Sequence, residues 1–136
     1  KYDPVNQMLK VDIFEGKTVK HTVVPVKVLL TYLRVLKNLG KGRHRKKTVA
    51  ELVMNELVKD PDASKRLQEY YVNGVFDWKK FFGGRQEYYE LFRAPVLLLD
   101  RLGILQEKRT AHIVVTDKIE SVDEKTLLSI LTRSRV

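Results

Sequence analysis

The stretch that decides the fold is RQEYYELFRAPVLLLDRLGILQEKRTAHIVVTDK, residues 85–118. Apolar residues at helical spacing predict a helix over 86–102. Pro95 should kink or restart this helix, because its ring removes one backbone hydrogen bond. Gly103 should end it. A short strand from Ile104, a charged turn and the β-branched run 112–116 then predict a β-hairpin. The buried face of the helix would be formed by Leu91, Phe92, Leu98, Leu99 and Leu102.

Two further helices are predicted upstream. The segment VKVLLTYLRVLKNLG, residues 26–40, has apolar residues at helical spacing and should end at Gly40. The segment TVAELVMNEL, residues 48–57, should begin with a capping box in which Thr48 and Glu51 bond to free backbone N–H groups. Between these helices lies GKGRHRKK, with five Lys or Arg, one His and no acidic residue. We expect this basic segment to be a connecting loop.

The remaining segments complete a predicted mainly α fold with a small β component. Alternating apolar residues predict a short N-terminal β-hairpin over 9–24, and helical spacing predicts helices over 63–71 and 121–131. The aromatic segment 75–82 could form a turn of helix. We expect residues 1–136 to form a single compact domain, with a construction from two helical modules, 1–60 and 61–136, as the alternative. Because the chain begins with Lys rather than Met, we also expect it to be a fragment of a longer protein, with other domains of the same chain as neighbours.

Charge is concentrated in one quarter of the chain. The net charge is +9, and residues 25–59 have nine Lys or Arg against two Glu, a net +7. A concentrated basic patch indicates a polyanionic partner such as nucleic acid. The alternatives for this segment are a solvated surface and a basic targeting peptide. The residues predicted to contact phosphates here are Lys41, Arg43, His44, Arg45, Lys46 and Lys47.

The run LDRLGILQ, residues 99–106, followed by a charged turn and HIVVT, resembles the end of a winged helix-turn-helix domain. In that family a helix closes on Leu-Gly and leads into a two-stranded wing. The resemblance covers about residues 60–118 and implies a winged-helix-like fold that binds double-stranded DNA. The helix pair at 26–40 and 48–57 makes the chain similar to the recognition portions of some restriction endonucleases.

The resemblance also implies roles for particular residues. The helix 86–102, or its first half, would enter the major groove, where Arg and Gln can pair with guanine and adenine. Lys108 and Arg109, at the wing tip, would contact phosphate or the minor groove. The residues predicted to contact bases are Arg85, Gln86, Tyr89 and Arg93.

Together with the basic segment, this resemblance implies an intracellular double-stranded DNA-recognition domain of a restriction enzyme or transcription regulator, located in the cytoplasm, nucleus or nucleoid. One alternative is an RNA or single-strand binder that stacks bases on its aromatic residues. Another is a helical protein-interaction domain.

We expect no enzymatic activity in this fragment. The sequence has no Walker-type phosphate loop, no GxSxG and no GxGxxG motif. His21, His44 and His112 lack metal-ligand spacing, and there is no Cys, so we expect no metal site and no cofactor. No run of apolar residues reaches the roughly 18 needed to cross a membrane, so no membrane partner is expected.

Overall fold

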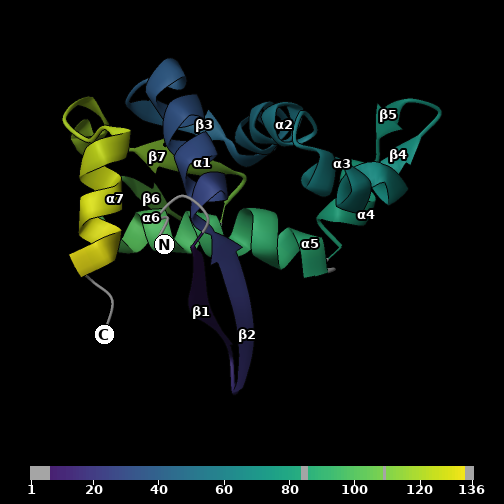
Figure 1. The fold of residues 1–136 in the computed structure, drawn as a ribbon, viewed down its shortest axis with the longest axis horizontal. Helices are drawn as coiled ribbons and strands as arrows, with labels where there is room; N and C mark the ends of the chain where they lie inside the picture. The colour runs from purple at the N-terminus through teal and green to yellow at the C-terminus, as the bar shows by residue number, and fades with distance from the viewer. Residues whose placement is uncertain (1–6, 84–85, 109, 134–136) are drawn as a thin grey trace.

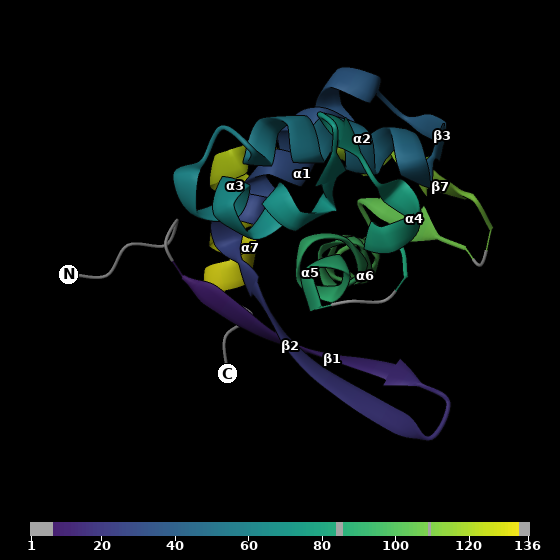
Figure 2. The ribbon, with the colours of Figure 1, turned by 90° about the vertical axis from the view of Figure 1, so that its right-hand side faces the viewer.

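The computed structural model describes residues 7–83, 86–108 and 110–133. Figures 1 and 2 show three layers: the helices α1 to α3, a long helix running through α5 and α6, and a projecting two-stranded ribbon, β1 and β2. The elements in chain order are β1 (Met8–Glu15), β2 (Thr18–Pro25), α1 (Val26–Leu39), β3 (Gly42–Arg45), α2 (Lys46–Leu57), α3 (Pro61–Leu67), η2 (Gln68–Tyr70), β4 (Tyr71–Val72), β5 (Val75–Phe76), α4 (Trp78–Phe81), α5 (Gln86–Tyr88), η3 (Tyr89–Arg93), α6 (Ala94–Arg101), β6 (Leu105–Glu107), β7 (His112–Val115), η4 (Asp117–Glu120) and α7 (Glu124–Arg133).

The predicted fold class, mainly α with a winged-helix-like arrangement, is wrong. Of the described residues 56% are helical and 25% lie in strands, which makes the fold a mixed one. The strands form one three-stranded sheet of order β3-β7-β6 and two separate hairpins, β1-β2 and β4-β5. The prediction underestimated the β content because it placed residues 42–45 in a loop, whereas they pair with β7.

The ribbon β1–β2 confirms the predicted N-terminal hairpin. Gly16 has φ of +61° in its two-residue turn, a conformation that glycine adopts without strain. Val11 and Ile13 alternate with exposed residues and are buried. Their face packs against α6 and η3, which attaches the ribbon to the helical layers.

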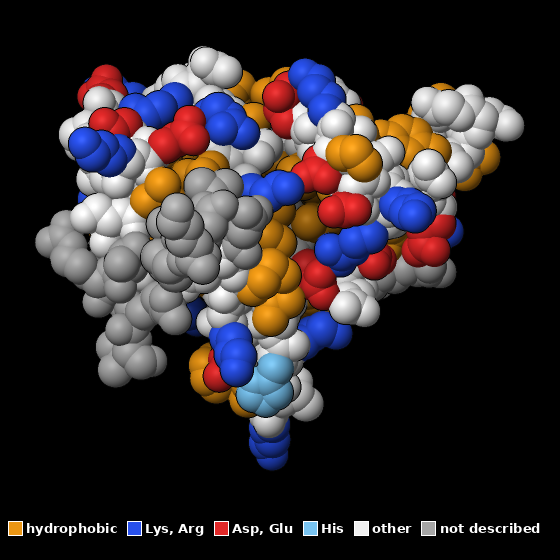
Figure 3. Space-filling model, viewed as in Figure 1, with side chains coloured by type: hydrophobic (Ala, Val, Ile, Leu, Met, Phe, Trp, Pro, Cys, Tyr) orange, Lys and Arg blue, Asp and Glu red, His pale blue; other side chains and the backbone are white. Residues whose placement is uncertain are grey.

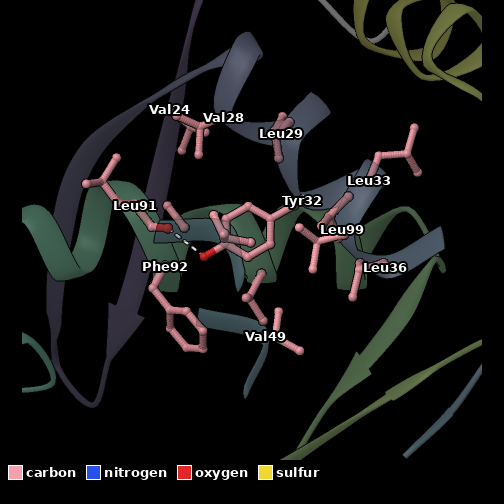
Figure 4. Packing of buried hydrophobic residues seen from close by; sticks show 14 of the residues in the cluster. Val24, Val28, Leu29, Tyr32, Leu33, Leu36, Val49, Leu91, Phe92 and Leu99 are labelled. Atoms are coloured by element: carbon pink, nitrogen blue, oxygen red, sulfur yellow. Dashed lines mark hydrogen bonds between the residues drawn. The ribbon is translucent and has the colours of Figure 1, made fainter. Parts of the chain in front are cut away.

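Helix α1 forms the centre of the core. Leu29, Tyr32 and Leu33 are fully buried, and Figure 4 shows the Tyr32 hydroxyl directed at the carbonyl oxygen of Leu91. The predicted stop at Gly40 is confirmed: its φ is +83° and its N–H donates to the Leu36 carbonyl oxygen at 2.8 Å. Buried residues between Val11 and Leu131 belong to one continuous hydrophobic cluster.

Pro95 lies inside a continuous helical segment, and a π-helical turn, η3, precedes it. Proline has no N–H to donate to the carbonyl oxygen of Leu91, four residues earlier. The buried Tyr32 hydroxyl donates to that oxygen instead, at 2.6 Å. Pro95 therefore does not break the helix. The turn before it is widened, and the carbonyl oxygen of Leu91 accepts a hydrogen bond from Tyr32 of α1.

The predicted capping box at Thr48 and Glu51 is wrong. Helix α2 begins at Lys46, two residues earlier, and its N-cap Arg45 makes no side-chain capping hydrogen bond. Strand β3 leads directly into this helix, and the Lys46 N–H donates to the Ala111 carbonyl oxygen at 2.8 Å. Strand pairing, rather than a side-chain cap, determines where α2 starts.

The other boundaries differ by a few residues. The helix expected over 63–71 is α3 followed by the 3-10 turn η2, and Asp60 caps α3 by accepting from the Asp62 N–H at 3.0 Å. The segment 75–82 divides into β5 and α4. The terminal helix expected over 121–131 is α7, which begins at Glu124.

Candidate nucleic-acid interface

The basic segment is an edge strand rather than a loop. Strand β3 pairs only with β7 among the described strands, with Gly42 opposite Val115 and Arg45 opposite His112. Alternate residues of a strand point to opposite faces. Arg43 and Arg45 therefore share one face and are exposed, whereas His44 is half-buried on the other. Lys41, which precedes the strand, and Lys47, the second residue of α2, are also exposed, and we call these two lysines and two arginines the basic edge.

The charges of the basic edge are scarcely neutralised within the chain. Arg45 and Lys47 form no ion pair with any residue that the structure describes. Lys41 Nζ lies 3.4 Å from a carboxylate oxygen of Asp117, but the Asp117 side chain is 85% exposed. Exposed ion pairs of this kind contribute at most about 1 kcal/mol and are screened by salt. The basic edge is thus available to an external anion.

The two arginines of β3 affect the pKa of His112 on the neighbouring strand β7. Arg43 Nη2 donates to His112 Nδ1 at 3.3 Å. The pKa of His112 lies below its usual value, first because of desolvation and then because of the positive charges of Arg43 and Arg45. An anion bound at the basic edge would offset those charges and favour the protonated imidazole.

His44, predicted to contact phosphate, has a structural role. Its Nε2 donates to the Gly40 carbonyl oxygen at 2.8 Å, which holds the turn between α1 and β3.

Lys46 is also engaged within the fold. Its Nζ lies 2.7 Å from Glu107 Oε1 and donates to the Lys108 carbonyl oxygen at 2.9 Å. The other carboxylate oxygen, Glu107 Oε2, lies 3.5 Å from Arg93 Nη1. The side chains of Lys46 and Glu107 are only 21% and 13% exposed. This network fixes the first residue of α2, so that the residues on either side, Arg45 and Lys47, point into solvent.

A shallow pocket of about 490 Å³ lies beside the start of α2. Helix α2 has no acidic residue in its first turn. The N–H groups that follow Lys46 in the first turn, and the positive end of the helix dipole, therefore add to the potential of the neighbouring cations. The pocket is lined by Arg45, Lys46, Lys47, Thr48, Phe82 and Ala111.

Three of the predicted base-contacting side chains, Gln86, Tyr89 and Arg93, are held by carboxylates of the same chain. Gln86 Nε2 donates to Glu90 Oε2 at 2.7 Å. The Tyr89 hydroxyl donates to a Glu15 carboxylate oxygen at 3.2 Å, and Arg93 pairs with Glu107 as described above. Only Arg93 is connected to the basic segment, through the carboxylate that it shares with Lys46. Base reading by these residues stays a prediction.

Arg85, also predicted to contact a base, lies outside the described residues. Of the two predicted turn residues, Lys108 is exposed after β6 and Arg109 lies outside the described residues.

The aromatic residues proposed as a stacking platform pack mainly on one another. Tyr70 and Phe81 are fully buried, with ring centroids 5.6 Å apart. Trp78 and Phe82 are half-buried and lie 6.0 Å apart in the same cluster. Large aromatic side chains are thus used chiefly to fill the space between α4, α5 and η3.

Glu107 is the residue beside the basic edge that sequence analysis missed. It organises the start of α2, yet it is 61 positions from Lys46 in the chain. Its position in a charged turn resembles that of any solvated Glu, so no local pattern could have identified it.

Within residues 7–83, 86–108 and 110–133 no group of three or more His, Asp or Glu side chains could hold a metal ion. No helix in the described part of the chain is long and apolar enough to cross a membrane. No protein-family model, curated protein or solved structure matches this chain significantly. Function is therefore inferred from the residues and their geometry.

Proposed function

We propose that the chain binds double-stranded DNA through its basic edge. The observation that supports this most directly is the alignment of Lys41, Arg43, Arg45 and Lys47 along an edge strand and the helix start that follows it, with little internal neutralisation. Residues two apart in a strand are separated by about 6.6 Å. This is about twice the 3.4 Å axial rise per phosphate of one DNA strand, so successive side chains can follow the phosphates along a strand.

The start of α2 adds a second type of phosphate contact. Helix N-termini bind phosphate through backbone N–H groups and the helix dipole. The first turn of α2 lies directly after Arg45, and Thr48 in that turn is exposed and can donate its hydroxyl proton. A phosphate held there would contact the helix and the cations of the basic edge together.

Duplex DNA is favoured over a single strand because single-strand binders present exposed aromatic faces to successive bases. Here Tyr70 and Phe81 are buried, and the half-buried rings pack in the same cluster. A protein-interaction role is less well supported, since Arg43, Arg45 and Lys47 make this surface charged rather than apolar. Contacts from these residues alone would read no bases, so the binding that they provide is independent of sequence.

Fluorescence anisotropy with a labelled duplex at several salt concentrations tests this proposal. With contacts from the basic edge to about four phosphates, the logarithm of the binding constant should fall with the logarithm of salt concentration with a slope of about −3.6. The double variant Arg43→Gln/Arg45→Gln should weaken binding and reduce the slope by about 1.8.

Lys65→Gln on α3 is the matched control, because Lys65 is exposed and lies outside the basic edge. This variant should leave the slope unchanged. No duplex binding at low salt, or equal losses in both variants, would contradict the proposal. Tighter binding to single-stranded DNA or RNA competitors would instead support the alternative nucleic-acid partner.

A further inference from the structure

We propose that strand β1 pairs edge to edge with β1 of a second copy of this chain, antiparallel, about a two-fold axis at Val11. This inference does not rest on the proposed function. Strands β1 and β2 form a ribbon that projects from the helical layers, and neither strand has another neighbour among the described strands. An unpaired strand edge presents N–H and C=O groups that can pair with a further strand.

The hairpin turn determines which backbone groups of β1 face the open edge. Glu15 and Thr18 close the two-residue turn, and such a pair exchanges both backbone hydrogen bonds. Every second pair along the ribbon repeats this arrangement. Lys10 and Asp12 therefore direct their N–H and C=O groups outward. In agreement, the Asp12 carbonyl oxygen accepts from Arg101 Nη2 at 3.3 Å, which leaves it a second lone pair.

The outer face of the ribbon combines exposed apolar side chains with charges. Met8 is 53% exposed and Phe14 is 67% exposed, which is unusual for such large apolar residues on an open edge strand. Lys10 forms no ion pair with the part of the chain that the structure describes. The Asp12 carboxylate pairs with His21, with Oδ1 2.6 Å from Nδ1, and its side chain remains half exposed. Figure 3 shows hydrophobic, basic, acidic and histidine side chains together on the projecting ribbon.

The strand is complementary to itself in one register. When Val11 lies opposite Val11 of the second copy, Lys10 lies opposite Asp12. In the same register Met8 lies opposite Phe14, and the two-fold axis makes each of these pairs occur twice. Cross-strand pairs of opposite charge and of large apolar side chains stabilise sheets.

The neighbouring registers on the same face are unfavourable. Sliding one strand by two residues places either Asp12 opposite Asp12 or Lys10 opposite Lys10, and like charges directly opposite destabilise a sheet. The pattern of charge in β1 therefore selects the register centred on Val11. The product would be a four-stranded sheet of order β2-β1-β1-β2.

Two paired eight-residue strands form a small interface, below the roughly 1,200 Å² of stable complexes, so we expect a weak dimer that depends on concentration. Sedimentation equilibrium on the whole chain, from about 20 μM to 1 mM, covers the range in which such an interface dissociates. Amide hydrogen exchange at Lys10 and Asp12 should slow as the concentration rises, because these N–H groups would become paired.

Charge exchange tests the register. Lys10→Asp and Asp12→Lys should each raise the dimer dissociation constant at least tenfold, because two attractive pairs become repulsive. An equimolar mixture of the two variants should form heterodimers, since aspartates at both positions then face lysines at both positions. The double exchange Lys10→Asp/Asp12→Lys should restore the homodimer.

Lys65→Asp changes the net charge by the same amount as Lys10→Asp, at an exposed position on α3, and should leave dimerisation unchanged. Both exchanged residues are exposed, so the circular dichroism spectra should match that of the wild type. A monomer at every concentration would overturn the proposal. A dimer insensitive to both single exchanges, or a mixture that does not associate, would also overturn it. DNA binding is measured separately, so failure of one proposal can be distinguished from failure of the other.

Discussion

Replacing Lys46 or Lys47 by Met should distinguish a lysine that stabilises the fold from a lysine that binds DNA. The two lysines are adjacent and have the same charge, and both were predicted from the sequence to contact phosphate. In the structure Lys46 Nζ lies 2.7 Å from Glu107 Oε1, whereas Lys47 is exposed and makes no ion pair within the described residues. We therefore expect Lys46→Met to lower stability and Lys47→Met to lower DNA affinity.

The expected loss of stability follows from the burial of the ion pair between Lys46 and Glu107. Exposed ion pairs contribute about 0–1 kcal/mol, whereas removing one partner of a fully buried pair costs about 3–5 kcal/mol. The side chains of Lys46 and Glu107 are 21% and 13% exposed, and Glu107 keeps a longer contact to Arg93 after the change. We expect Lys46→Met to lower the free energy of unfolding by about 2 kcal/mol, and Lys47→Met by less than about 0.5 kcal/mol.

Urea unfolding and salt-dependent anisotropy, run on the same preparations, measure both effects. Lys47→Met should reduce the salt slope of DNA binding by about 0.9, and Lys46→Met should leave the slope near that of the wild type. In a double-mutant cycle, Glu107→Gln should make the loss caused by Lys46→Met smaller, because the unpaired carboxylate is gone. Wild-type stability combined with a reduced slope in Lys46→Met would refute the reasoning.

Three further predictions concern other contacts. Tyr32→Phe should lower the free energy of unfolding by about 1–2 kcal/mol by leaving a buried carbonyl without a donor. Pro95→Ala restores an N–H that can donate to this carbonyl oxygen, so Tyr32→Phe should cost less stability in the Pro95→Ala background. Additive effects of the two substitutions on the free energy of unfolding in urea would contradict this account. The pKa of Asp60 lies below 3.8, chiefly because it accepts a hydrogen bond from Lys27. The ionised Asp60 carboxylate therefore stabilises the fold fully above the pKa of the unfolded chain, and this stabilisation is lost as the pH falls through the lowered pKa of the folded state. The difference in the free energy of unfolding between the wild type and Asp60→Asn should shrink between about pH 5 and pH 3, and a constant difference would contradict this account. By NMR titration His112 should have a pKa below 6.5, and excess duplex DNA should raise it; an unchanged pKa would argue against phosphate beside the β3 arginines.

Local patterns in the sequence predicted the elements whose formation depends on neighbours in the chain. The spacing of apolar residues identified α1 and the N-terminal ribbon, because each buries one face at its own period. Gly40 and Gly103 were identified as helix ends, and both have a positive φ of about 80° in the structure. The concentration of charge in residues 25–59 was also evident, since composition alone reveals it.

Only the tertiary structure decided what the basic segment is. Residues 42–45 become a strand because β7, about 70 positions away, provides the hydrogen-bonding partner. That pairing directs Arg43 and Arg45 outward and starts α2 at Lys46 rather than at the predicted cap. Lys46 then forms an ion pair with Glu107 and is not one of the exposed charges. Strand pairing and ion pairs join residues that are distant in sequence, and short-range periodicity contains no information about which distant partner will be nearby.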